Sequence, residues 1–199
     1  MNRLFIVLLF MSIQSVCGQS KLDTTIFLQS NPGDSLSDIP TNSKKFSVHH
    51  ESRKLVKSKL LPKIGVYIDH SQWGYRKSSI NEHSEYTFIN KVYECSGVLL
   101  TETTEDISIF DVDFFTLAGA QIWDPEAQLF HREFRTVNNV NVLCIGIVGS
   151  IKSLKYQGLG YIYTDGSKVV QLFAYTTQKK YQRNYWVLER FLNGLMLLQ

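Results

Sequence analysis

The chain has 199 residues, of which 44% are hydrophobic and 13% aromatic, with only 4 prolines. This composition excludes a disordered or low-complexity chain, and the length leaves room for one globular domain beside a polar N-terminal part. The net charge of +3 is unevenly distributed. Seven basic residues and one acid lie between Lys44 and Lys63, whereas 12 basic and 14 acidic residues follow from Ile64 onward. The fold itself is therefore slightly acidic, and no nucleic-acid interface is expected.

Residues 1–18 have the pattern of a secretory signal peptide. Arg3 gives a positive start, Leu4 to Ile13 is an almost uninterrupted apolar run, and Gly18 is a small residue at the cleavage position. A membrane-spanning helix needs about 20 apolar residues, so the run favours cleavage, no membrane span in the mature chain, and export to the periplasm or the extracellular space. The alternative is a lipid anchor at Cys17. A lipid-attachment site usually has a small residue just before the cysteine and an aliphatic residue three positions before it, where this chain has Val16 and Gln14.

Residues 19–63 are rich in Ser, Thr, Asn, Asp, Pro and Lys. Such a segment buries little apolar surface, so the sequence predicts a flexible polar and basic leader over this range. Residues 64–199 are then expected to form a single domain.

Short runs of aromatic and β-branched residues begin at Ile64 and predict four strands in an antiparallel meander. These runs cover residues 64–68, 73–77, 84–89 and 93–101. A helix is predicted next, opened by Thr103 and Asp106 as a capping box, with Ile107, Phe110, Phe114, Leu117 and Ile122 at helical spacing.

Two hairpins follow the helix. Asn138-Asn139 separates apolar runs over 129–137 and 140–150, and Asp165-Gly166 separates runs over 155–164 and 168–177. These residue pairs tolerate the positive φ of tight hairpin turns. From Gln178 the period becomes helical and predicts a terminal amphipathic helix with one apolar stripe. The stripe consists of Tyr181, Tyr185, Leu188, Leu192 and Leu195.

The C-terminal half resembles the PsbP-like superfamily. The resemblance rests on Gly160-Tyr161-Ile162-Tyr163, a tight turn, the strand from Val170 to Thr176, and a helix that ends Phe191-Leu192-Asn193-Gly194-Leu195. It implies an α+β fold in which an antiparallel sheet lies between helices, an α/β/α sandwich. It also implies a binding or assembly role, because the known members of the superfamily are mainly binding or assembly proteins and share no catalytic motif.

No catalytic, metal or cofactor motif is evident in the sequence. The histidines lack the spacing of a zinc site, and Cys95 with His131 forms a nucleophile–base pair only by residue type. Cys95 and Cys144 remain as a pair in an export compartment, so they form either a disulfide or two buried free thiols on neighbouring strands.

The start of the terminal helix is the predicted binding site. Lys179, Lys180 and Arg183 place positive charge where the helix dipole opposes it, and with Gln178 and the free backbone amides they could receive an anionic group. The sequence therefore favours an exported, non-enzymatic binding or assembly domain whose partner is an envelope protein or an anionic ligand. The alternative function is a secreted hydrolase with an unrecognised active site.

Overall fold

A computed structural model describes residues 39–47, 54–80, 83–151 and 153–198. The predicted signal peptide, Cys17 and the mature start at Gln19 lie outside these residues. No helix among the described residues is long and apolar enough to cross a membrane.

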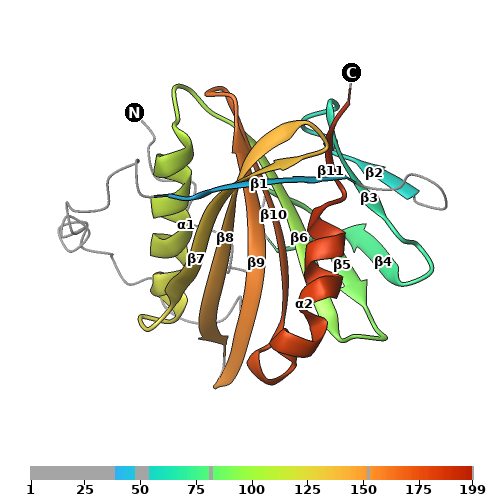
Figure 1. Cartoon of the computed structure of the whole chain (residues 1–199), viewed down its shortest axis with the longest axis vertical. Helices are drawn as coiled ribbons and strands as arrows, with labels where there is room; N and C mark the ends of the chain where they lie inside the picture. Colours follow the sequence, from blue (N-terminus) through green and yellow to red (C-terminus); the bar gives the residue numbers. More distant parts are fainter. Residues whose placement is uncertain (1–38, 48–53, 81–82, 152, 199) are drawn as a thin grey trace.

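An eight-stranded sheet forms the centre of the molecule, in the order β1-β7-β8-β9-β10-β6-β5-β4 (Figure 1). Its strands are β1 (Thr41–Phe46), β4 (Trp73–Lys77), β5 (Ser84–Asn90), β6 (Cys95–Thr103), β7 (Gln128–Val137), β8 (Val140–Ile151), β9 (Leu154–Thr164) and β10 (Lys168–Thr177). All neighbouring pairs are antiparallel except β1 and β7, which run parallel. The prediction of a purely antiparallel sheet is therefore wrong at this one edge, and the sheet is mixed.

A second sheet of three strands has the order β11-β3-β2. It is built from β2 (Lys54–Lys57), β3 (Ile64–Ile68) and β11 (Leu195–Leu197), and β11 directly follows the terminal helix. This small sheet packs its apolar residues into the same core cluster as that helix.

The two helices cover opposite faces of the large sheet. Cys144 and Tyr161 belong to the core cluster that the sheet forms with α2 (Gln178–Leu192), and Leu172 belongs to it as well. Leu143 and Ile162, each next in the chain to one of the first two, belong to the cluster on the side of α1 (Ile109–Trp123). This division follows from the alternation of side chains along a strand. It agrees with the predicted sandwich of helices and sheet, in which α1 and α2 appear on either side of the strands (Figure 1).

Helix α1 begins later than predicted. Its N-cap is Ser108, whose hydroxyl accepts a hydrogen bond from the backbone of Asp111, and the Asp111 carboxylate accepts one from the backbone of Ser108. Asp106 has a φ of 51° and is not helical. The capping box is thus formed by Ser108 and Asp111 and not, as predicted, by Thr103 and Asp106. Phe114, predicted to lie on the apolar stripe of this helix, is 41% exposed.

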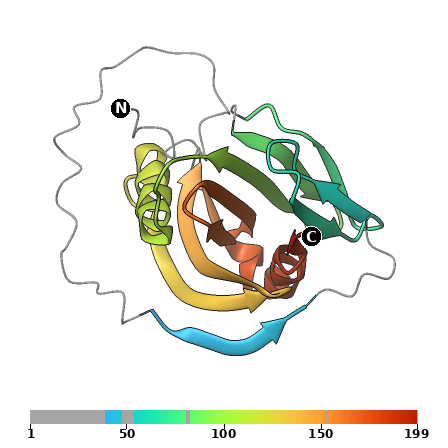
Figure 2. The same cartoon turned by 90° about the horizontal axis from the view of Figure 1, so that it is seen from above.

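The range predicted as a flexible leader contains two strands. β1 pairs with β7 at the outer edge of the large sheet, where it is the blue strand in Figure 2, and β2 pairs with β3. Phe46 and Val56 are buried in the core of α2. The domain therefore begins before Ile64. The sequence did not indicate this, because a single apolar residue in a polar strand gives no periodic pattern, although its side chain still fills the core.

A chain shortened to begin at Leu60 is expected to have a free energy of unfolding about 3–6 kcal/mol lower than that of the chain that begins at Gln19. It lacks the buried side chains of Phe46 and Val56, each of which contributes about 1.5–3 kcal/mol. Urea denaturation measures the difference, and a chain that begins at Asp38 and keeps both strands is the control. Equal unfolding midpoints for all three chains would contradict the role of β1 and β2.

Candidate functional site

A β-bulge in β7 shapes the sheet surface under α2. The register between β7 and β8 shifts between Leu129 and His131, so that Phe130 is the extra residue. Phe130 contacts the ring of Tyr181 on α2 at 5.7 Å between centroids. Gly146 on β8 leaves the space for this arrangement, since a Cβ atom there would lie 2.5 Å from the Phe130 ring and 2.9 Å from Cβ of His131.

Beyond the bulge, β7 points three polar side chains in succession toward α2, namely His131, Glu133 and Arg135. Arg135 is only 5% exposed, and its guanidinium pairs with Glu133 and with Glu189 of α2, the latter at 3.0 Å. The same guanidinium donates to the hydroxyl of Tyr161 at 3.1 Å. A buried charge of this kind is stable only when it is fully paired, as it is here.

The network continues from Arg135 to the end of α2. The Tyr161 hydroxyl donates to Oδ1 of Asn193 at 2.7 Å, and Phe46 of β1 lies over the Arg135 guanidinium at 4.8 Å from its ring centroid. Burial raises the pKa of the Tyr161 hydroxyl, so it remains a neutral donor. The network thus joins β1, β7, β9 and α2 in one polar core.

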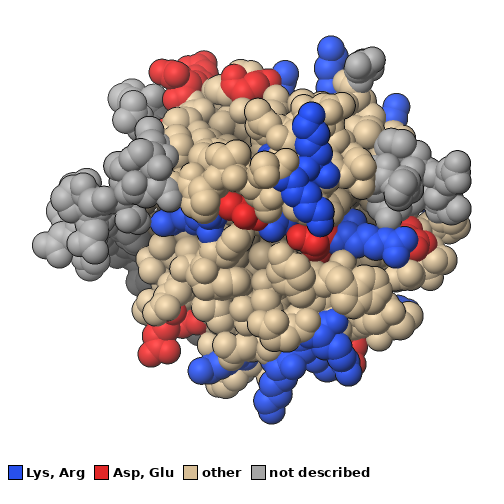
Figure 3. All heavy atoms as spheres, in the orientation of Figure 1, with Lys and Arg blue, Asp and Glu red and all other residues tan. Residues whose placement is uncertain are grey.

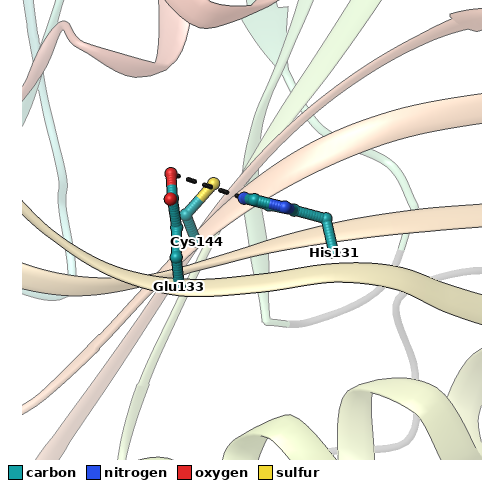
Figure 4. Close-up of side chains that lie close together, drawn as sticks. All are labelled: His131, Glu133 and Cys144. Carbon is teal, nitrogen blue, oxygen red and sulfur yellow. Dashed lines mark ion pairs between the residues drawn. The ribbon is translucent and has the colours of Figure 1, made fainter. Parts of the chain in front are cut away.

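His131, Glu133 and Cys144 lie together beside this network (Figure 4). Nε2 of His131 is 3.4 Å from Oε1 of Glu133, and one ligand atom of each residue lies within 4.8 Å of the others. Burial would raise the pKa of the Glu133 carboxyl, but the hydrogen bond and the charge of Arg135 outweigh it, and the pKa lies below its ordinary value. Glu133 is therefore a carboxylate at neutral pH.

The trio has the residue types of a nucleophile, a base and an acid, but Cys144 is unsuited to nucleophilic attack. Its side chain is 0% exposed, and burial raises the pKa of its thiol to about 12. The reactive form of cysteine is the thiolate. We therefore assign no catalysis to this trio.

Cys95, which the sequence pairs with His131 by residue type, lies elsewhere in the fold. It is on β6, where its thiol donates to the backbone carbonyl of Tyr93, and burial raises its pKa. Strands β9 and β10 separate β6 from Cys144 on β8. Three strand spacings amount to about 14 Å, beyond the reach of a disulfide. Both cysteines are free buried thiols, so the disulfide alternative is wrong.

The predicted binding residues Gln178, Lys179, Lys180 and Arg183 do lie together at the start of α2, where Figure 3 shows basic side chains gathered at the lower edge. Lys180 forms an ion pair with Glu94 of the β5–β6 turn, and its hydrogen bond and charge lower the pKa of Glu94. Gln178, Lys179 and Arg183 are exposed.

An exposed aromatic group adjoins these cations. Trp186 is 45% exposed one turn along α2 from Arg183, and its ring lies 5.2 Å from that of Tyr93. Val92, next to Tyr93 in the same turn, is 72% exposed. Sequence reasoning missed this group, although a tryptophan outside the apolar stripe of an amphipathic helix is itself a signal.

Comparison with known proteins identifies the fold. No family model matches the chain, and no curated protein matches its sequence. The solution structure of cyanobacterial PsbP (CyanoP) from Synechocystis superposes with a TM-score of 0.58 at 8% identity, covering 75% of this chain and 95% of that one. The Ran-binding protein Mog1p of Saccharomyces cerevisiae superposes with a TM-score of 0.51 at 8% identity, covering 74% and 96%.

Identity this low carries the architecture and not the activity. The agreement nevertheless extends over nearly the whole length of both known structures. The protein therefore has the PsbP-like fold, as the pattern from Gly160 onward predicted.

Proposed function

We propose that this protein is an exported, non-enzymatic binding or assembly domain of the cell envelope, and that it docks through the start of α2 and the adjacent β5–β6 turn. We name this area the α2–turn surface. It comprises Gln178, Lys179, Lys180, Arg183 and Trp186 of α2 with Val92 and Tyr93 of the turn. The observation that carries the proposal is the exposed Trp186 beside a group of cations.

Tryptophan and arginine are the residues most often responsible for binding energy at protein interfaces. Trp186 is held in place by Tyr93, and Lys180 is held by Glu94, so both lose little freedom on binding. An apolar centre beside positive charge is complementary to an apolar side chain surrounded by carboxylates. We therefore propose an acidic patch of another envelope protein as the partner.

Export is part of the same proposal and rests on the sequence of residues 1–18. N-terminal sequencing of the protein recovered from the host envelope should find Gln19 as the first residue. A lipid-modified Cys17 at the N-terminus would instead show an anchored protein, and an intact Met1 would show that the chain is not processed.

The docking proposal predicts that Trp186→Ala weakens partner recovery. The mature protein is used to capture its partner from envelope extract, the partner is identified by mass spectrometry, and its affinity for each variant is measured with both proteins purified. We expect Trp186→Ala to weaken binding by at least about 30-fold, since interface anchors contribute about 2 kcal/mol or more. Lys179→Gln with Arg183→Gln should also weaken binding, and added salt should mimic that loss.

Matched controls come from other faces of the molecule. Phe114→Ala removes an exposed aromatic ring from α1 on the opposite side of the sheet. Lys57→Gln with Lys63→Gln removes two exposed cations on or beside the small sheet. Equal weakening by these controls, or unchanged binding of the Trp186 variant, would overturn the α2–turn surface as the docking site.

The alternative of a secreted hydrolase requires an accessible and reactive group. The Cys144 thiol beside His131 meets neither requirement, because it is fully buried and its pKa is raised. The binding role is therefore the better supported of the two.

A further inference from the structure

We propose that His131, Glu133 and Cys144 bind a zinc ion on the α2 side of the large sheet. These residues supply an imidazole nitrogen, a carboxylate oxygen and a thiol sulfur that gives up its proton to solvent as the ion binds. Imidazole nitrogen, carboxylate oxygen and thiolate sulfur are the three ligand types that zinc takes from proteins. Their ligand atoms already lie within 4.8 Å of one another, so only small side-chain rotations bring them around one ion.

The backbone fixes this arrangement. His131 and Glu133 are two residues apart on β7 and so share one face of the strand, and Glu133 is the direct cross-strand partner of Cys144 on β8. The bulge at Phe130 lies immediately before His131 and interrupts the regular pairing, which continues on its other side with Leu129 opposite Ile147. Three ligands on two adjacent paired strands form a rigid site, in which the ion adds no large ordering cost.

The His131 imidazole has an unused nitrogen that faces the other two ligands. Nε2 is buried and has no hydrogen-bond partner among the described residues, while it lies 3.4 Å from the Glu133 carboxylate. A buried nitrogen without a hydrogen bond is costly. A cation placed between Nε2, the carboxylate and the sulfur would satisfy it.

Arg135 is compatible with a bound cation. A carboxylate accepts several hydrogen bonds, so Glu133 can keep its contacts with Arg135 and Asn42 and still offer a lone pair to zinc. Such outer contacts orient metal-binding carboxylates in known sites. The charges also balance: two carboxylates, Glu133 and Glu189, a thiolate and one guanidinium sum to minus two, which a divalent ion neutralises.

The ion also has a route to the site. The His131 side chain is 35% exposed, and the neighbouring Phe130 is 44% exposed, so the imidazole reaches from the surface to the buried sulfur. With three protein ligands, a tetrahedral zinc ion would keep its fourth position for water or for a group from a partner.

Cobalt titration of the tag-free mature protein tests the proposal, because Co²⁺ substitutes for zinc and gives a near-ultraviolet absorption band only when a thiolate binds it. We expect this band in the unaltered protein and its displacement by Zn²⁺. Cys144→Ser should abolish the band, whereas the matched control Cys95→Ser, at the buried cysteine on β6 outside the trio, should retain it.

His131→Gln should weaken cobalt binding at least about tenfold, since even outer-shell changes at metal sites cost about 10–100-fold. Because His131 is partly exposed, its replacement should disturb folding less than that of Cys144. The His131 variant therefore still tests the zinc site if Cys144→Ser does not fold. The proposal is overturned if the unaltered protein shows no thiolate band, if the band is lost with Cys95→Ser, or if His131→Gln binds cobalt as tightly as the unaltered protein.

Discussion

Replacement of Arg135 by alanine is expected to lower the free energy of unfolding by about 3–5 kcal/mol, the usual cost of removing one partner from a buried ion pair. The guanidinium is the shared partner of Glu133, Glu189 and the Tyr161 hydroxyl. Its loss leaves two carboxylates on the same side of the sheet without a counter-charge. Urea denaturation in the presence of a metal chelator measures the effect without interference from bound ions.

Lys168→Ala is the matched control for Arg135→Ala. Lys168, the first residue of β10, pairs with Asp165 of the preceding turn at 3.5 Å, and both side chains are substantially exposed. Exposed pairs contribute about 0–1 kcal/mol. A loss at Arg135 no larger than that at Lys168 would mean that water replaces the guanidinium, and that the network does not hold α2 to the sheet.

Leu188→Ala is expected to cost about 2–5 kcal/mol, as large-to-small changes in cores do. Leu188 is 0% exposed on the face of α2 that packs in the main core. Thermal and urea unfolding measure the loss. Gln182→Ala is the control on the exposed face of the same helix, where a change within about 0.5 kcal/mol is expected. Similar effects at the two positions would contradict the packing of α2 on the sheet.

The regular elements could be predicted because their signals are local. The turn residues Asn138 and Asn139 have φ values of 48° and 64°, and Gly166 has a φ of 89°, as the predicted hairpins require. Strand β3 spans Ile64–Ile68 and β4 spans Trp73–Lys77, in agreement with the runs of β-branched and aromatic residues. Each of these features depends on neighbouring residues alone.

The sequence was less informative where several local signals compete. Helix α1 carries apolar residues around most of its circumference, so periodicity did not single out its buried face. Val112 and Thr116 are buried, while Phe114 is exposed. Two capping pairs with the same spacing also precede the helix, and the left-handed conformation of Asp106 decides between them in favour of Ser108.

The candidate sites divide in the same way. The cations at the start of α2 are close in sequence, so their grouping follows from helical spacing. The contact of the exposed Trp186 with Tyr93 joins residues far apart in the chain, so only the tertiary structure shows it. Neither a spacing motif nor a cysteine count indicated the trio of His131, Glu133 and Cys144, because the trio depends on which residues face each other across β7 and β8.

By itself, the sequence determined the strands between Ile64 and Thr177, the hairpin turns, the amphipathic α2 and the PsbP-like pattern, since backbone conformation and side-chain periodicity are set over a few residues. Only the tertiary structure decided the parallel pairing of β1, the separation of Cys95 from Cys144, and the burial of Arg135. These depend on strand order and register, which join residues far apart in the chain and leave no local periodicity to read.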